Sequence, residues 1–328
     1  MNPPGPLLVT GGLGYMGGRL IRALRRDDPR REIRVLTRRA PDRRPAWAGD
    51  LPVFQGDLRA PSAPGPALDG VDTVIHLAAL GEVESQRDPW QAVEVNVGGT
   101  VRLIEAARRA GVRRVLYLST IHVYGRLSEG PITEDTLPSP THPYAITHLA
   151  AEQFVLAEAR KGTLGGLVFR VSNGYGCPAD PLVDQWNLVF LDLCRQAARA
   201  GCLTLKSSGR AHRHFVCLED AARVVAMALG WPEERWRGDV FNLGGECSLS
   251  MKEVADRIAA VAQRRYGRPV EIRTGPPGGP DEGRPVDFRI DRLKAEGFAP
   301  RHDWEAEIAA TLALCRSSNA DCGLRNAE

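Results

Sequence analysis

The chain has 328 residues, of which 43% are hydrophobic and 25% charged, a composition typical of a globular protein with a sizeable core. Its 43 basic and 40 acidic residues leave a net charge of +3, which gives no general attraction to nucleic acid or to an anionic membrane. No apolar run approaches the roughly 18 to 20 residues that cross a bilayer, and no charged leader precedes an apolar stretch at the start. We therefore expect a cytoplasmic protein that binds neither nucleic acid nor membrane.

The seven cysteines are scattered along the chain, and their number is odd. The sequence contains no Cys-x-x-Cys pair, so neither a zinc site nor a disulfide framework is indicated. We expect reduced and mostly buried thiols, with no bound metal.

Short runs of β-branched and apolar residues alternate with helical patterns through the first half of the chain. The expected elements, in chain order, are a strand at Leu7–Thr10, a helix from Tyr15, strands at Ile33–Leu36 and Val71–His76, a long helix over Ala92–Ala110, a strand at Val115–Ser119, a helix from Tyr144 toward Arg160 and a strand at Leu167–Val171. Such alternation is typical of parallel βαβ units with helices on both faces of the sheet. The predicted fold class is therefore α/β, a Rossmann-type doubly wound parallel sheet.

The regular alternation fades after Val171, which indicates a smaller C-terminal lobe that binds the substrate. Helices are expected at about Gln185–Ala200 and Ser250–Tyr266, with a connection rich in glycine and proline at Gly275–Gly279. The predicted division is a dinucleotide-binding domain of residues 1–172 plus 211–245, a substrate-binding lobe of residues 173–210 plus 246–316, and a flexible tail of residues 317–328.

A glycine-rich turn follows the first expected strand at once and opens the first expected helix. It reads Thr10-Gly11-Gly12-Leu13-Gly14-Tyr15-Met16-Gly17-Gly18. Glycines at this spacing permit a tight turn, bring the backbone close to a pyrophosphate and let the helix press on the sheet. The helix N-terminus adds unpaired N–H groups and the positive end of its dipole. The alternative is a structural turn without a ligand, but the context predicts a dinucleotide held by Gly11, Gly14, Tyr15, Met16 and Gly17.

Arg38 and Arg39 follow the second expected strand, where an acidic residue would hold the adenosine ribose of NAD. A guanidinium group suits the 2′-phosphate of NADP instead. The sequence therefore favours NADP over NAD as the cofactor, the alternative being that both arginines are solvated surface charge.

Two further segments resemble the extended short-chain dehydrogenase/reductase family, which contains nucleotide-sugar epimerases, dehydratases and ketoreductases. Ser119-Thr120-Ile121-His122-Val123-Tyr124-Gly125 is similar to the family's Ser-Thr-x-x-Val-Tyr-Gly strand end, and Tyr144-Ala-Ile-Thr-His148 to its Tyr-x-x-x-Lys helix. The resemblance implies that Thr120 hydrogen-bonds the reacting oxygen and that Tyr144 is the acid/base. The lysine of the family is replaced by His148.

This replacement affects how the tyrosine can ionise. A tyrosine hydroxyl has an unperturbed pKa near 10 and needs a nearby positive charge to ionise near neutrality. His148, at i+4, can replace a hydrogen bond to the nicotinamide ribose, but a histidine is mostly neutral at pH 7. Three hypotheses stay open: His148 orients the cofactor while the nicotinamide charge activates Tyr144; proton transfer moves to another group, with His122 first; or the chain binds a cofactor but has lost catalysis.

The same resemblance assigns further positions to the cofactor. Asp57 and Leu58, after the third short strand, match the place where relatives hold the adenine edge, and Leu77, Ala78 and Ala79 match the strand end beside the cofactor. Asn96 matches a buried asparagine of the same region that ties strands together. We expect the Leu77–Ala79 segment and Asn96 to serve mainly as scaffold.

The substrate is expected to be a nucleotide sugar. Asn173, Arg213 and Arg284 lie in segments that resemble the family's contacts to a diphosphate, and guanidinium groups bind such oxygens through bidentate, charge-assisted hydrogen bonds. Ile121-His122 stands where 4,6-dehydratases carry an Asp-Glu pair, which argues against dehydration. The remaining activities are epimerisation and 4-ketoreduction. The family also often pairs through two long helices, here Ala92–Ala110 and Ala145–Arg160, so a homodimer is expected.

Overall fold

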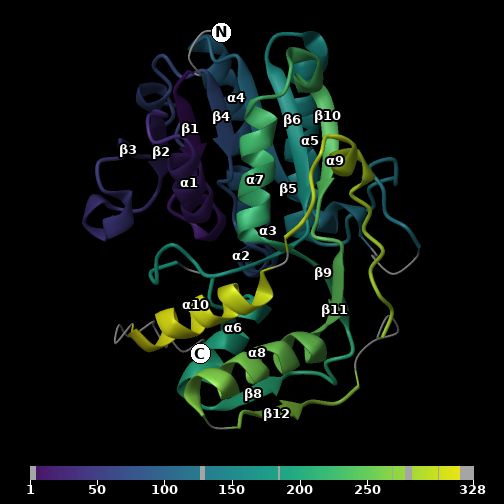
Figure 1. The fold of residues 1–328 in the computed structure, drawn as a ribbon. Coiled ribbons are helices and arrows are strands. Elements are labelled where there is room, and N and C mark those ends of the chain that lie inside the picture. The colour runs from purple at the N-terminus through teal and green to yellow at the C-terminus, as the bar shows by residue number, and fades with distance from the viewer. Residues whose placement is uncertain are drawn as a thin grey trace.

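The computed structural model describes residues 5–125, 130–183, 185–267, 269–277, 283–301 and 303–317. Its centre is a seven-stranded parallel sheet (Figure 1). The strands, in their order across the sheet, are β10 (Arg237–Leu243), β6 (Gly165–Val171), β5 (Arg114–Thr120), β4 (Thr73–His76), β1 (Leu7–Thr10), β2 (Ile33–Thr37) and β3 (Val53–Gln55). The order reverses between β1 and β4, which is the point where doubly wound sheets bind their ligands. The predicted Rossmann-type fold is confirmed.

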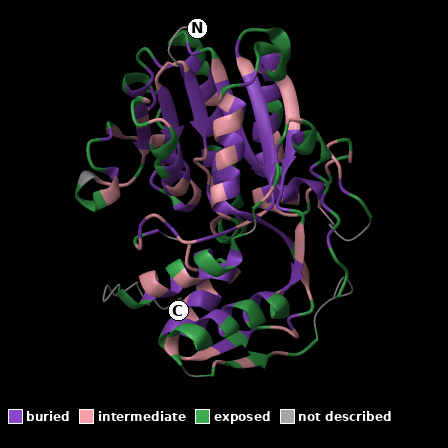
Figure 2. Cartoon of the chain, in the orientation of Figure 1, coloured by how far each residue is buried: buried purple, intermediate pink, exposed green. Residues whose placement is uncertain are grey.

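Alternating side chains of β1 show how the two faces of the sheet are covered. Leu7 and Val9 pack into the core with α1 (Tyr15–Asp27) and α7 (Leu218–Leu229), whereas Leu8 packs on the opposite side with other helices. Those helices are α4 (Gly99–Arg109) and α5 (Pro143–Lys161). Because both faces are covered, the inner strands β6, β5, β4 and β1 are buried over nearly their whole length, whereas the edge strands β3 and β10 are partly exposed (Figure 2).

The expected single helix over Ala92–Ala110 is divided into three parts. α3 (Pro89–Ala92) leads into η4 (Val93–Gly98), a π-helical stretch that continues as α4. Within this stretch Asn96 is turned inward, and its carboxamide bonds the N–H of Leu80 at 2.7 Å and the hydroxyl of Thr147 at 3.0 Å. A π-helical turn rotates the side chains that follow it relative to a regular α-helix. The inward hydrogen bonds of Asn96 occur within this π-helical turn.

The smaller lobe has its own core. It contains α6 (Val189–Arg199), α8 (Met251–Tyr266) and α10 (Trp304–Ser317), with Trp304 stacked on Tyr175 at a ring-centroid distance of 3.7 Å. α6 begins at Val189 instead of Gln185. Residues 318–328, nearly all of the expected tail, lie outside the described residues, as do residues 278 and 279 of the Gly- and Pro-rich connection.

The remaining elements are short. They are β7 (Asn173–Tyr175), β8 (Cys202–Leu205), β9 (His212–Cys217), β11 (Cys247–Ser250), β12 (Glu271–Thr274), α2 (Glu82–Arg87), α9 (Asp291–Ala295), η1 (Pro41–Arg43), η2 (Ala46–Ala48), η3 (Gly65–Ala67), η5 (Ile121–Tyr124) and η6 (Glu233–Trp236). No helix in the described part of the chain is long and apolar enough to span a membrane.

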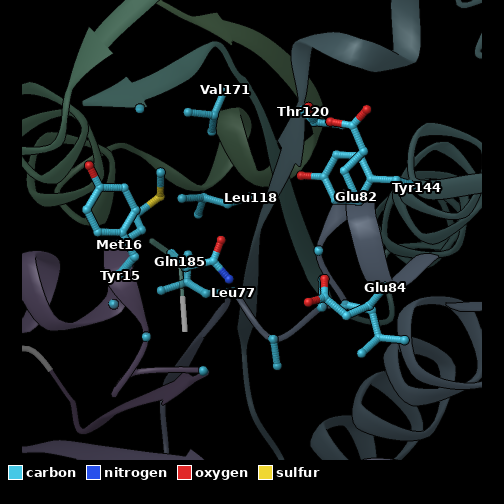
Figure 3. A pocket seen from close by; sticks show the side chains of 18 of the residues that line it. Tyr15, Met16, Leu77, Glu82, Glu84, Leu118, Thr120, Tyr144, Val171 and Gln185 are labelled. Atoms are coloured by element: carbon cyan, nitrogen blue, oxygen red, sulfur yellow. The ribbon is translucent and has the colours of Figure 1, made fainter. Parts of the chain in front are cut away.

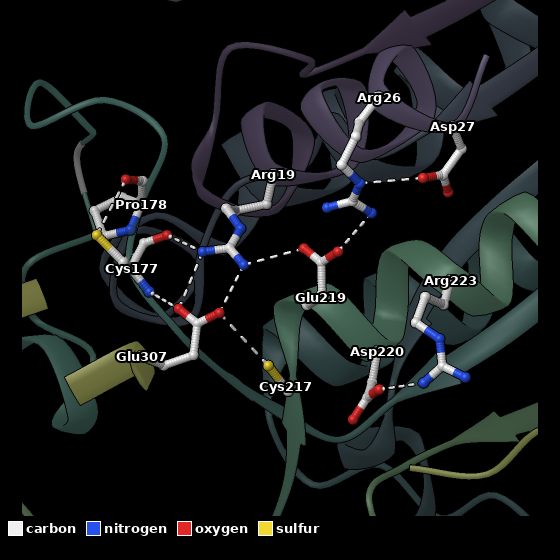
Figure 4. Close-up of polar contacts among 10 residues, drawn as sticks. All are labelled: Arg19, Arg26, Asp27, Cys177, Pro178, Cys217, Glu219, Asp220, Arg223 and Glu307. Carbon is white, nitrogen blue, oxygen red and sulfur yellow. Dashed lines mark hydrogen bonds and ion pairs between the residues drawn. The ribbon is translucent and has the colours of Figure 1, made fainter. Parts of the chain in front are cut away.

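A polar cluster joins the sheet's helices to the smaller lobe (Figure 4). The guanidinium of Arg19 in α1 bonds the carboxylate of Glu307 in α10 at 2.6 and 3.0 Å, and that of Glu219 in α7 at 3.2 Å. Glu307 also accepts the backbone N–H of Cys177 at 2.6 Å. Glu307 is buried, so these donors satisfy its oxygens, and the cluster fixes α10 against α1.

Candidate active site

A cavity of about 910 Å³ opens at the carboxyl ends of the central strands (Figure 3). Thr120, Tyr144 and Glu82 lie together on one side of it, and Tyr15 and Met16 lie on the other side. Its size falls at the upper end of the range for small-molecule sites. No group of three His, Cys, Asp or Glu residues suited to a metal ion occurs among the described residues.

The glycine turn forms one end of the cavity and leaves no room for side chains. Gly11 has φ +67°, and a Cβ there would lie 3.0 Å from the backbone nitrogen of Ala78. A Cβ on Gly17 would lie 2.5 Å from the carbonyl oxygen of Gly11. Gly14 is the N-cap of α1 and provides no side-chain cap, so the first N–H groups of the helix stay available. This cradle fits a pyrophosphate.

The next part of the cavity wall carries several cations. Arg38 is exposed there, and no hydrogen bond or ion pair of its side chain is found within the described ranges, whereas Arg39 pairs with Asp180 at 2.6 Å. Asp57 also lines the cavity, and Arg59, 2.7 Å away, lowers the pKa of its carboxyl. The two arginines of the sequence motif therefore differ: Arg39 is bound to the protein, and Arg38 faces the cavity without a partner there.

Leu58, Leu77, Ala78 and Ala79 line the cavity as well. The hydroxyl of Thr10 accepts hydrogen bonds from the N–H groups of Leu77 and Ala78, at 3.3 and 3.2 Å, which fixes the wall beside the turn. Asn96 is 1% exposed and is not among the lining residues. Its bonds to Leu80 and Thr147 hold the wall from behind.

Tyr144 and Thr120 meet at the reactive side of the cavity. The pKa of Tyr144 is raised to about 12, chiefly by burial; a hydrogen bond with the Thr120 side chain opposes this rise, and the carboxylate of Glu82 adds to it by a smaller amount. Glu82 begins α2 and is exposed on the cavity wall. The phenol therefore stays protonated at neutral pH, chiefly because it is buried.

His148 lies one helical turn after Tyr144, with their ring centroids 4.5 Å apart. Burial lowers the pKa of His148 to about 3, so its imidazole is neutral. Nδ1 lies 2.8 Å from the hydroxyl of Tyr117, while Nε2 is buried and has no hydrogen-bond partner among the described residues. The unsatisfied Nε2 fits a bound group with a hydroxyl, such as a cofactor ribose.

Two more histidines stand beside Tyr144. The ring of His122 lies 6.3 Å from it, and that of His142 stacks on it at 6.1 Å with an interplanar angle of 4°. Burial lowers the pKa of His122 to about 4. His122 lines the cavity as a neutral imidazole, whose ring carries one N–H and one lone pair.

The three residues expected to bind the diphosphate are not brought together in the cavity. Asn173 lines it, with its amide nitrogen donating to the carbonyl of His214 at 2.9 Å. Arg213 and Arg284 are exposed and are not among the lining residues. Their roles in substrate binding remain predictions.

Sequence reasoning missed several residues of the site. Glu82, His142 and Tyr117 surround the reactive pair, and Gln185 and Asn187 line the cavity from the segment before α6. Gln185 and Asn187 could have been found from the sequence, because they are polar residues in a connection that leads into a helix, where binding residues are common.

The chain matches known proteins over nearly its full length. The profile described as "NAD dependent epimerase/dehydratase family" matches residues 7–244. A dTDP-glucose 4,6-dehydratase of Streptomyces griseus is 32% identical, covering 94% of this chain and 93% of the relative. A UDP-glucose 4-epimerase of Streptomyces lividans is 29% identical, covering 84% and 86%.

Solved structures agree with these relatives. The UDP-glucose 4-epimerase of Thermus thermophilus in complex with NAD has a TM-score of 0.80 and 27% identity, covering 95% of this chain and 99% of that one. RMD from Pseudomonas aeruginosa, complexed with NADPH, has a TM-score of 0.76 and 26% identity, covering 95% and 99%. With its glycine cradle and its Thr120–Tyr144 pair, this chain belongs to the NAD dependent epimerase/dehydratase family.

Proposed function

We propose that this protein reduces the ketone of a keto-sugar nucleotide, as a 4-ketoreductase that uses NADPH. The observation that carries the proposal is the absence of a cation beside Tyr144, where the neutral ring of His148, 4.5 Å away, stands in place of the family's lysine and burial keeps the phenol protonated. A protonated phenol can donate a proton to a carbonyl oxygen, whereas abstraction of a proton from an alcohol requires the phenolate. The site thus favours reduction.

The chain's own residues divide the work as follows. The amides of the glycine turn hold the pyrophosphate, His148 faces the nicotinamide ribose, and Thr120 holds the substrate oxygen. Tyr144 donates its proton to that oxygen as it becomes a hydroxyl. When bound, the nicotinamide supplies the hydride.

Arg38 supports NADPH over NADH. Its guanidinium lies on the cavity wall without a partner among the described residues, and Arg43 lines the same region. A 2′-phosphate would receive charge-assisted hydrogen bonds there. The nearby carboxylate of Asp57 is bound to Arg59, and the charge of Arg38 also lowers its pKa.

A nucleotide sugar is the proposed substrate. Support comes from the amides of Asn173, Gln185 and Asn187 on the cavity wall, and from relatives whose names specify dTDP-glucose and UDP-glucose. In this proposal Arg213, whose charge acts on His122 at the cavity wall, and Arg284 bind the diphosphate. MoeE5, 29% identical with a TM-score of 0.77, was solved with UDP-glucose and NAD.

Epimerisation at C4 is the second candidate. It is favoured by the similarity to UDP-glucose 4-epimerases in both sequence and structure. It requires Tyr144 to act as acid and base in turn, with the positive charge of oxidised nicotinamide as the activating group. His122 is the alternative proton carrier in either reaction.

Purified protein tests the proposal in two steps. Thermal unfolding should shift upward with NADPH more than with NADH, because a ligand that binds only the folded state stabilises it. A panel of keto-sugar and plain sugar nucleotides should then show consumption of NADPH only with the ketones, and Tyr144→Phe should abolish it. The absence of any shift with either dinucleotide would refute the function, whereas turnover of plain sugar nucleotides without net NADPH consumption would favour the epimerase.

We further propose that the protein is a homodimer. Large apolar side chains are exposed on one region formed by α3, η4 and α5: Trp90 is 72% exposed, Phe154 45%, Ile146 50% and Val93 42%. Single exposed apolar residues are ordinary, but a group on adjoining helices is typical of an interface. A second copy of the chain, pairing these helices across a two-fold axis, would cover them.

A further inference from the structure

Tyr117 and His148 form a buried pair behind the reactive side of the cavity. Tyr117 lies within β5 and packs against α5, which carries His148. The tyrosine is 1% exposed and the histidine 4% exposed. The hydroxyl oxygen and Nδ1 are 2.8 Å apart, which is a good hydrogen bond.

The direction of this hydrogen bond follows from which of its two atoms carries the proton. Burial raises the pKa of Tyr117 well above its usual value, so the phenol keeps its proton. Among the described residues, His148 Nδ1 is the hydroxyl's one hydrogen-bond partner, and a buried O–H without an acceptor is unfavourable. The hydroxyl therefore donates, and Nδ1 accepts with its lone pair.

The tautomer of His148 is then determined. A neutral imidazole carries one N–H and one lone pair, so a lone pair on Nδ1 places the proton on Nε2. That atom is buried and has no partner among the described residues, although His148 lines the cavity. An N–H in this position is a donor that a bound molecule can satisfy.

We propose that Tyr117 is a positioning residue that fixes His148 as the Nε2–H tautomer and so presents a neutral hydrogen-bond donor to the ribose of the cofactor. The identity of that acceptor rests on the proposed function, but the tautomer itself does not. In this proposal the Tyr117–His148 pair makes the ribose hydrogen bond that the family's lysine makes. Unlike the lysine, it carries no positive charge.

The neighbouring titratable groups do not compete for the same hydrogen bond. His76 in β4 lies 5.4 Å from the Tyr117 ring, but its two nitrogens already contact the hydroxyls of Thr10 at 2.6 Å and Thr100 at 2.9 Å. Tyr144 faces His148 from the same helix, and its own bond is to Thr120. His122, on η5, makes no hydrogen bond with His148 among the described residues.

Nitrogen NMR of ¹⁵N-histidine-labelled protein tests the tautomer directly, since the two ring nitrogens shift in opposite senses when one carries the proton. His148→Gln assigns the signals by removing them. We expect wild-type His148 to remain neutral with its proton on Nε2 between about pH 5 and 8. In Tyr117→Phe we expect a mixture of tautomers and NADPH binding weakened about 3- to 10-fold, as for loss of one oriented hydrogen bond.

Tyr175→Phe is the matched control, because Tyr175 is also a fully buried tyrosine but its hydroxyl has no partner among the described residues. It should leave both the His148 signals and NADPH binding unchanged. A proton on Nδ1 in the wild type would overturn the proposal whether or not Tyr117→Phe folds. If the tautomer is as expected but no dinucleotide binds, the proposed function fails and the cofactor part of this inference fails with it, while the Tyr117–His148 assignment stands.

Discussion

Replacing His148 by lysine should restore a positive charge beside Tyr144 and lower the pKa of its phenol. The rings of His148 and Tyr144 are 4.5 Å apart, so an ammonium in this place would lie about 5 Å from the phenol oxygen. At an effective dielectric constant of about 20, one charge at that distance stabilises the phenolate by about 3 kcal/mol, or about 2.4 pKa units. From its present value of about 12, the pKa should fall to about 10.

The sign of the effect on activity differs between the two directions. Reduction needs the protonated phenol, so its alkaline limit should move from about pH 12 to about pH 10 in His148→Lys. Oxidation needs the phenolate, whose fraction at pH 8 should rise about 100-fold. The activity profile therefore moves to lower pH.

Ultraviolet titration of tyrosinate, taken as the difference from the corresponding Tyr144→Phe variant, measures the pKa without substrate. His148→Gln is the control, since a neutral amide should leave the pKa of Tyr144 at about 12. An unchanged titration in His148→Lys would refute the reasoning, because it would mean that charge at position 148 does not act on this phenol. His122 would then become the leading group for proton transfer.

Three further predictions concern the cofactor, the polar cluster and the dimer. Arg38→Ala should weaken NADPH binding about 10- to 100-fold in a fluorescence titration and leave NADH binding nearly unchanged. Arg39→Ala is the control, because Arg39 is paired with Asp180, and it should affect the binding of the two cofactors about equally. Equal loss of NADPH and NADH binding in Arg38→Ala would contradict the assignment. Glu307→Gln should lower the free energy of unfolding by about 2 kcal/mol in denaturant titration, because Arg19 loses the nearer of its two carboxylate partners and keeps Glu219. The exposed pair of Glu305 makes Glu305→Gln a near-neutral control, and equal effects would contradict this. Trp90→Glu should give a monomer in light scattering and Leu137→Glu, exposed but outside the α3–η4–α5 region, should not; a monomeric wild type would refute the dimer.

The fold was largely predictable because its strands are local and apolar. β1 matches its expected bounds, and β5 and β6 differ from expectation by two residues or fewer at each end. β10 was missed, since it begins Arg237-Gly-Asp and joins the sheet only by pairing with distant β6. The π-helical η4 was also missed, because apolar periodicity over a few residues does not separate it from an α-helix.

The site was predictable where its residues lie within one segment of the chain. The glycine turn, the strand-end Thr120 and the Tyr144–His148 spacing each depend on local order alone. Glu82 and Tyr117 were missed because their roles come from contacts between segments: one reaches Tyr144 from α2, and the other looks like an ordinary core aromatic in a strand. Arg213 and Arg284 show the opposite case, in which a recognisable segment did not place the side chain on the cavity.

The replacement of lysine by histidine is accompanied by changes around it that act in one direction. Burial keeps His148 neutral, Tyr117 hydrogen-bonds its Nδ1, and the carboxylate of Glu82 adds a smaller effect that opposes ionisation of the phenol. A cation at position 148 would favour the phenolate, whereas these neighbours favour the phenol. A site that must alternate between acid and base gains nothing from such a bias, but a site that only donates a proton needs the phenol neutral in every turnover. In the proposed reductase these three side chains hold Tyr144 in the protonated form that donates to a carbonyl, while the equilibrium between ketone and alcohol is set by the substrate and the cofactor.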